Sequence, residues 1–180
     1  MRTLVFLLVI TASLLVIPRT APSETLSKAE RERAIAYLIE TRDSLQKEVA
    51  GLSSAQLRFR TAADRWTIAE IVEHVATVEK SVLAQVYQLA QQPPNRDRPS
   101  ESQLKEGDEQ VIRTFRDRSR KLTAPEALRP TGIPAENAWR MFAEAREASL
   151  QFAQTTLADL RVRTQDTPLV KGMDGVQFLL

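Results

Sequence analysis

The chain has 180 residues, 25 basic and 23 acidic, and a pI near 9.1, which at first suggests a nucleic-acid or membrane partner. The excess charge is local, because residues 1–23 hold Arg2 and Arg19 and no acidic residue, which leaves 23 of each sign in residues 24–180. The lack of cysteine excludes disulfides, cysteine-ligated metal sites and a thiol nucleophile. His74 is the single histidine, so no site can draw two histidines from this sequence.

The N-terminus has the pattern of a targeting segment. Residues 4–17 are uncharged and would span about 21 Å as a helix, less than the roughly 30 Å of a bilayer core. Ala21 and Ser23 then supply small residues for cleavage after Ser23. We predict a signal peptide at 1–23 and an exported domain at 24–180, periplasmic or extracellular. The alternative is an uncleaved N-terminal membrane anchor.

The rest of the chain has the pattern of an all-α protein. Helices are expected from 27 to 51, from 67 to about 91, from 100 onwards, and over about 135–160, because apolar residues recur at the helical period. Ile71, Phe115 and Leu157 are among the side chains expected to face the core. Four such helices predict one antiparallel up-down bundle. Three helix starts have a capping box, a serine or threonine followed three residues later by glutamate or glutamine: Ser27–Glu30, Thr67–Glu70 and Ser100–Gln103.

Polar residues interrupt the first helix, and the last segment is unusual. Arg42 and Gln46 fall within the apolar stripe of the first helix, so they either extend to solvent at a bundle end or line a polar pocket. Asp174 and Gln177 have the spacing of another helix start. Since only six residues follow Asp174, we predict a C-terminal helix that has barely begun, in a truncated sequence. Residues 178–180 should add little stability unless they pack back on the bundle.

His74 is the one candidate for proton transfer near neutral pH or for imidazole metal ligation. It lies about 100° from Val75, the centre of the apolar stripe of its helix, and so borders a groove between helices. Glu70 lies one turn earlier, whereas Glu73 and Glu79 are expected to point elsewhere. A plain structural role is the competing interpretation, because spacing alone does not make a metal site here.

A basic cluster on the third helix does not predict a nucleic-acid interface. It is interrupted by Asp117, lies in a domain of zero net charge, and is expected to be a solvated face. Its members are Arg113, Arg116, Arg118, Arg120 and Lys121.

Several motifs together resemble the DinB-like superfamily. The segment 52–57, LSSAQL, is similar to the family's turn, and residues 66–75, WTIAEIVEHV, are similar to its second helix start. The resemblance continues in Phe142 with Arg146 and in residues 168–179, and it spans nearly all of 26–180. It implies an up-down four-helix bundle.

The resemblance also implies a divalent metal, zinc or nickel, bound by three histidines. His74 matches one ligand, and the other two would form an H-x-x-x-H pair on a helix after residues 172–174, beyond Leu180. We therefore expect no tight metal binding by residues 24–180 alone. The implied function is that of a metal-dependent hydrolase or a transferase, some relatives being thiol-dependent, acting on an unknown small molecule. An exported protein would meet little cytosolic thiol, which weakens the transferase interpretation.

The alternative function is a non-catalytic helical binding or stress-associated module in which His74 is structural. No nucleic-acid partner is expected, and a homodimer is left open.

Overall fold

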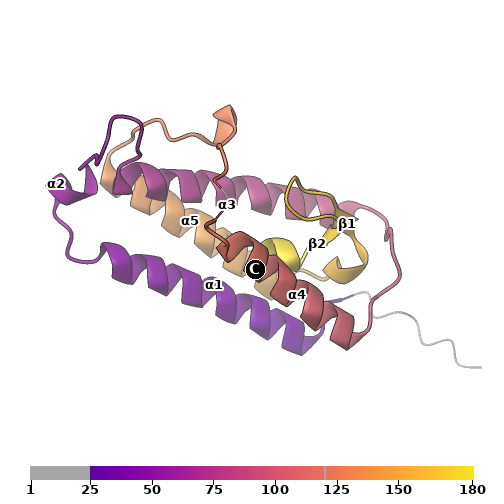
Figure 1. Ribbon diagram of the computed structural model, residues 1–180. Coiled ribbons are helices and arrows are strands. Elements are labelled where there is room, and N and C mark those ends of the chain that lie inside the picture. Colours follow the sequence, from indigo (N-terminus) through magenta and orange to yellow (C-terminus); the bar gives the residue numbers. More distant parts are fainter. Residues whose placement is uncertain (1–24, 120) are drawn as a thin grey trace, which may run out of the picture.

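The computed structural model describes residues 25–119 and 121–180, so the predicted signal peptide lies outside the described residues. The all-α prediction is confirmed (Figure 1). Within the described part, no helix is both long and apolar enough to cross a membrane. The helices are α1 (Lys28–Val49), α2 (Ser54–Leu57), α3 (Ile68–Gln91), α4 (Glu101–Arg116) and α5 (Ala135–Thr155).

All three predicted capping boxes are present. In each, the hydroxyl accepts the N–H of the third helical residue, whose side chain accepts the cap N–H in return, at the starts of α1, α3 and α4. A fourth box, formed by Ser53 and Gln56, begins α2 inside the segment that resembles the family's turn. These starts were predictable because both partners lie within three residues.

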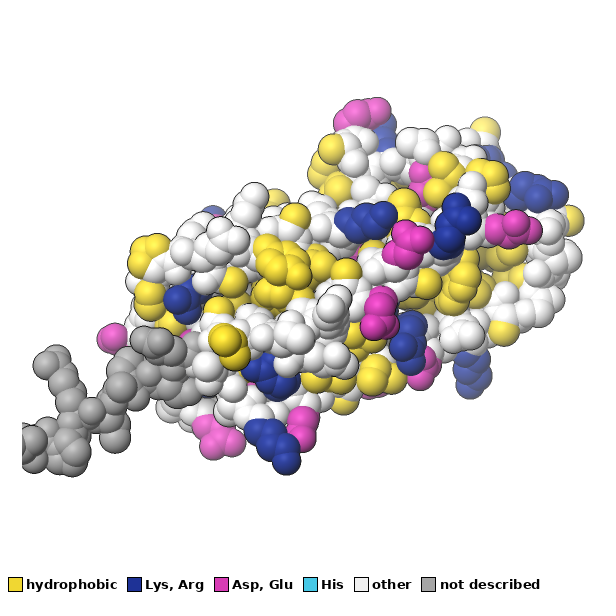
Figure 2. Space-filling view, turned by 180° about the vertical axis from the view of Figure 1, so that it is seen from behind, with side chains coloured by type: hydrophobic (Ala, Val, Ile, Leu, Met, Phe, Trp, Pro, Cys, Tyr) yellow, Lys and Arg dark blue, Asp and Glu magenta, His cyan; other side chains and the backbone are white. Residues whose placement is uncertain are grey.

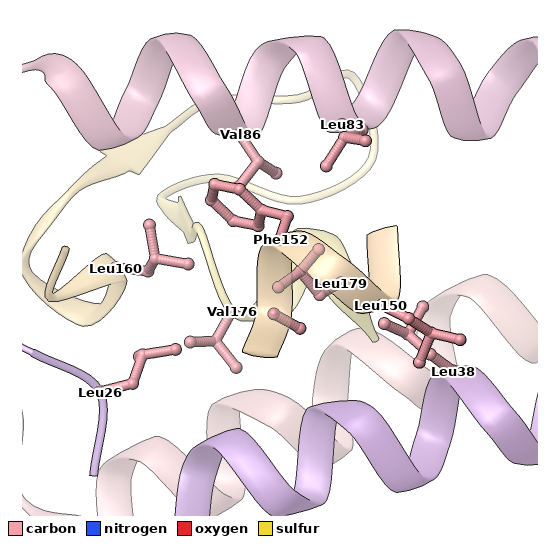
Figure 3. Packing of buried hydrophobic residues seen from close by; sticks show 10 residues of the cluster. Leu26, Leu38, Leu83, Val86, Leu150, Phe152, Leu160, Val176 and Leu179 are labelled. Atoms are coloured by element: carbon pink, nitrogen blue, oxygen red, sulfur yellow. The ribbon is translucent and has the colours of Figure 1, made fainter. Parts of the chain in front are cut away.

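The long helices lie side by side along the molecule, with α5 packed against both α3 and α1 (Figure 1). One apolar cluster lies toward the α3 N-terminus and contains Val72, Ala76, Ala138 and Phe142. The larger cluster joins α1, α3 and α5 to the C-terminal segment. Its members are Leu26, Leu38, Leu83, Val86, Leu150, Phe152, Ala153, Leu160, Val176 and Leu179 (Figure 3).

The C-terminal segment is part of this core. After α5 the chain forms short 3-10 turns at η2 (Leu160–Val162) and η3 (Gln177–Leu179), and β1 (Thr164–Gln165) pairs antiparallel with β2 (Met173–Asp174). Asp174 accepts the Gln177 N–H at 2.9 Å, as predicted, but one 3-10 turn follows. Val176 and Leu179 lie between α3 and α1 in Figure 3, and Leu179 is 5% exposed. The segment therefore does pack back on the bundle.

Some predicted boundaries and faces were wrong. The last long helix ends at Thr155 and not at residue 160, because the chain turns there to insert Leu160 into the core, and Leu157 is left 77% exposed. Ile71 and Phe115 are also exposed. The spacing of apolar residues predicts which face of a helix is apolar, but it does not show how much of that face a neighbouring element covers.

The structure also shows where Arg42, a polar residue within the apolar stripe of α1, lies. Arg42 bonds to the adjacent Asp43 carboxylate at 2.8 Å near the surface, which agrees with the solvent-directed interpretation. The same helix does line a cavity, but with Tyr37, Leu38 and Thr41.

Candidate functional site

A cavity of about 330 Å³ lies beside His74. Its walls come from α1, α3, α5 and the last residues of the chain, and most of its lining is apolar. The lining residues are Tyr37, Leu38, Thr41, His74, Val75, Val78, Glu79, Val82, Leu83, Arg146, Ser149, Phe178, Leu179 and Leu180. The prediction that His74 borders a space between helices agrees with this placement.

The His74 ring is oriented by the backbone of a distant loop. Nδ1 lies 2.7 Å from the carbonyl oxygen of Leu128, in the 3-10 turn η1 (Glu126–Leu128). A carbonyl oxygen can only accept, so Nδ1 donates, and in the neutral ring Nε2 carries the lone pair. The Trp66 ring also contacts the imidazole, with centroids 4.9 Å apart. Holding one nitrogen in this way selects the tautomer that a ligating or proton-accepting histidine needs.

Glu73, next to His74, anchors the same loop. It is 4% exposed, and its carboxylate accepts hydrogen bonds from Thr131, Gly132 and Ile133. Burial alone would raise the pKa of Glu73, but these hydrogen bonds outweigh it and lower the pKa below its usual value. Glu73 therefore stays ionised, and it points away from the cavity as predicted.

Glu79 was predicted to point elsewhere, and this was wrong, since it lines the same cavity as His74. The Arg146 guanidinium holds it in a bidentate pair, with N···O distances of 2.6 and 3.0 Å. Arg146 also donates to Thr41 Oγ1 at 2.6 Å and to the Leu38 carbonyl, and it lies over the Phe142 ring. The two charges in the cavity wall therefore neutralise each other.

The described residues do not by themselves form a site for zinc or nickel. Across residues 25–119 and 121–180, no three His, Cys, Asp or Glu side chains lie close enough to hold one ion. His74 offers one nitrogen, and Glu79, the carboxylate that shares its cavity, is held by Arg146. The three-histidine set that the family resemblance implies stays a prediction.

A second polar cluster lies near the N-terminal end of α1. We did not predict it from the sequence. Arg161 is 2% exposed and donates to Glu30 at 3.0 Å, to Asp108 at 2.7 and 2.8 Å, and to Asp174 at 3.2 Å. Burial disfavours its charge, but the Asp108 and Asp174 carboxylates outweigh this and raise the pKa of Arg161. Three more arginines complete this cluster, each paired with an acidic member: Arg33, Arg96 and Arg98.

A larger cavity, about 470 Å³, lies between α4 and residues 169–172. It carries no imidazole, and its one arginine, Arg96, is paired with Asp174 at 2.8 Å. The cavity at His74 is the better candidate for chemistry.

Of the predicted basic cluster, Arg113 and Arg116 lie at the surface of α4, Arg118 and Lys121 are exposed beyond the end of this helix, and Arg120 lies outside the described residues. Arg113 pairs with Glu109 at 3.6 Å, and the Arg116 guanidinium lies 5.9 Å from the centre of the Tyr37 ring. Figure 2, which shows the face of the molecule turned away from the viewer in Figure 1, has basic and acidic side chains interspersed on that face. The lack of a nucleic-acid partner stays a prediction.

A comparison with protein families identifies a family to which the chain is similar. The family model described as mycothiol-S-transferase matches residues 34–171, which cover most of α1, all of α3, α4 and α5, the loop at η1, and His74. Comparisons with curated proteins and with solved structures find no match.

Proposed function

Because the chain belongs to the mycothiol-S-transferase family, a DinB-like family, we propose that it is a small-molecule transferase with its reaction centre at the His74 cavity. The scaffold we propose is the up-down four-helix bundle of the DinB-like superfamily. The observation that carries the proposal is the 2.7 Å contact between His74 Nδ1 and the Leu128 carbonyl at the edge of a 330 Å³ cavity.

His74 is the proton acceptor in this proposal. A thiol R–SH gives its proton to Nε2, and the thiolate sulfur attacks an electrophilic carbon, whose bond to a leaving group breaks. The imidazolium then returns the proton to the leaving group or to water. An imidazole suits this step because its usual pKa lies near neutral pH and somewhat below that of a thiol. The Leu128 carbonyl continues to accept from Nδ1 in both charge states of the ring.

The acceptor substrate in this proposal is uncharged and apolar. Val75, Val78 and Val82 form one wall of the cavity, and residues 178–180 form another. The Arg146 guanidinium donates to Glu79, to Thr41 and to the Leu38 carbonyl, so an anionic substrate would meet a guanidinium whose charge Glu79 already neutralises.

The test is a thiol-transfer assay on the full chain. The protein is incubated with a low-molecular-weight thiol and an uncharged haloaromatic electrophile, with a chelator or with added zinc or nickel, and thioether is quantified by chromatography. We expect catalysis that His74→Ala lowers by about 100-fold or more, the usual contribution of a general base. Glu109→Gln, on the surface of α4, is the control and should retain the wild-type rate.

The outcomes of the thiol-transfer assay distinguish between the possible roles of His74. Transfer that appears only with added metal, and is lost in His74→Ala, would overturn the proton-acceptor role and favour ligation by His74. No transfer under any of these conditions would overturn the transferase proposal and favour a non-catalytic module. Equal loss in His74→Ala and Glu109→Gln would show that the assay reports folding alone.

We also propose that residues 1–23 direct export, in which case the thiol substrate would have to be supplied outside the cytosol. Cells that express the full chain should release it with the periplasmic or extracellular fraction, shortened by the signal segment. Retention of the intact chain in the soluble cytosolic fraction would contradict export, and retention in the membrane fraction would favour the anchor.

A further inference from the structure

Two adjacent residues of α3 hold the loop that connects α4 to α5. Figure 1 shows this connection crossing α3 before it reaches the start of α5. His74 holds it at the Leu128 carbonyl, and Glu73 holds it three to five residues later, at residues 131–133. The loop is thus attached to one turn of one helix at two successive places.

The attachment at Glu73 is complete on both carboxylate oxygens. Oε1 accepts the Thr131 N–H and hydroxyl, both at 2.7 Å, and Oε2 accepts the N–H groups of Gly132 and Ile133 at 2.9 and 3.1 Å. Gly132 has φ of 82°, a conformation that favours glycine and that turns successive N–H groups toward one anion. Four bonds to a buried carboxylate form a strong clamp.

The clamp limits where the Leu128 carbonyl can lie. Only Arg129 and Pro130 separate Leu128 from Thr131, and the proline ring fixes one backbone torsion in that short span. Pro134, the cap residue of α5, restricts the other side of the clamp. A shift of residues 131–133 would therefore move the carbonyl on which the His74 ring depends.

We infer that Glu73 is a positioning residue that sets the tautomer of His74 through residues 128–131. The inference rests on the proposed function in one respect. The proposed function needs a lone pair on Nε2 at the cavity, and this is the tautomer that Glu73 would set. Without the clamp, the Leu128 carbonyl loses its place and the neutral ring populates the form protonated on Nε2, which cannot accept a proton there.

The single histidine makes this directly measurable. In the ¹⁵N-labelled full chain, purified without a histidine tag, the two ring nitrogens of His74 give the only imidazole signals. At a pH where the ring is neutral, the nitrogen shifts and the two-bond couplings report which nitrogen is protonated. We expect the wild type to be protonated on Nδ1, and Glu73→Gln to shift the ring largely to the Nε2-protonated form, because an amide NH₂ would face the N–H donors of the loop.

Two further variants keep the test decisive. Thr131→Val deletes one of the four bonds and leaves the backbone bonds, so it should give a smaller shift in the same direction even if Glu73→Gln folds poorly. Glu30→Gln is the matched control, since Glu30 also accepts a backbone N–H, from Ser27 at 2.9 Å, but in α1. It should leave the His74 tautomer unchanged.

A folded Glu73→Gln with the wild-type tautomer would overturn the inference, as would an equal shift in Glu30→Gln. Failure of the proposed function is distinguishable, because the nitrogen spectrum does not depend on turnover. If the wild type transfers no thiol but Glu73→Gln still moves the tautomer, the positioning role stands and the transferase proposal falls.

Discussion

The Arg161 cluster and the His74 cavity lie in one small helical protein, yet they differ in how completely their polar groups are hydrogen-bonded. At Arg161 each guanidinium nitrogen donates to a carboxylate, and two of the acceptors, Asp108 and Asp174, are fully buried. At His74 one ring nitrogen donates to the Leu128 carbonyl, and the residue lines a cavity. We therefore expect the Arg161 cluster to contribute to stability and the His74 ring to take part in chemistry.

The largest expected effect comes from breaking the Arg161 cluster. Arg161→Met leaves two buried carboxylates without their shared partner, and removing one member of such a cluster typically costs about 3–5 kcal/mol of unfolding free energy. Urea denaturation would measure it. Lys171→Ala is the matched control, because its pair with Asp166 is exposed and should contribute little to stability. Similar losses in both variants would contradict the special role of the buried cluster.

Leu179→Ala should have the next largest effect. Leu179 is 5% exposed within the main apolar cluster, and truncating a buried leucine typically costs about 2–5 kcal/mol. Phe178, beside it, is only half-buried and should lose less when changed to Ala. Denaturation of both variants would check this. A negligible loss for Leu179→Ala would contradict the role of this segment in the core.

The charge cluster should also make stability depend on pH. Burial raises the pKa of Glu30, but hydrogen bonds from Ser27, the charge of Arg98 and a hydrogen bond from Arg161 outweigh it and leave the pKa below its usual 4.5. A depressed folded-state pKa contributes stability that is present above 4.5 and is lost as pH falls through the folded value. The gap in unfolding free energy between wild type and Glu30→Gln should therefore shrink in acid. A gap that stays constant from pH 7 to pH 3 would rule this out.

Of the two sites compared, the smaller stability effect is expected at His74. His74→Ala removes one half-buried ring and one hydrogen bond, so its unfolding free energy should fall by only about 1 kcal/mol while thiol transfer is lost. Denaturation and the transfer assay on the same preparation would show this separation. A loss as large as that of Arg161→Met would make His74 a structural residue.

Local patterns in the sequence predicted the helix starts, because a capping box is complete within four residues. They did not predict the end of α5, which depends on Leu160 packing near Gly175 from a separate segment. The pairing of Arg161 with Asp108 could not be predicted either, since the two residues are 53 positions apart and no local sequence pattern links them.

A weaker signal for the missed residues was present. Asp108 lies between Leu104 and Val111, at spacings of four and three, and so falls on the buried stripe of its helix. Glu73 has the same place between Ala69 and Ala76. A charge on an apolar stripe at this spacing must find a buried partner, although the sequence does not say which. The same reasoning could have found Arg146, four residues after the buried Phe142.

The most direct test of the account is the nitrogen spectrum of His74 in the wild-type protein. If the cavity holds an imidazole prepared for chemistry, the neutral ring will be protonated on Nδ1, which faces Leu128, and unprotonated on Nε2. A ring protonated on Nε2, or a mixture like that of free histidine, would contradict the contact on which the proposed function and the role of Glu73 both depend.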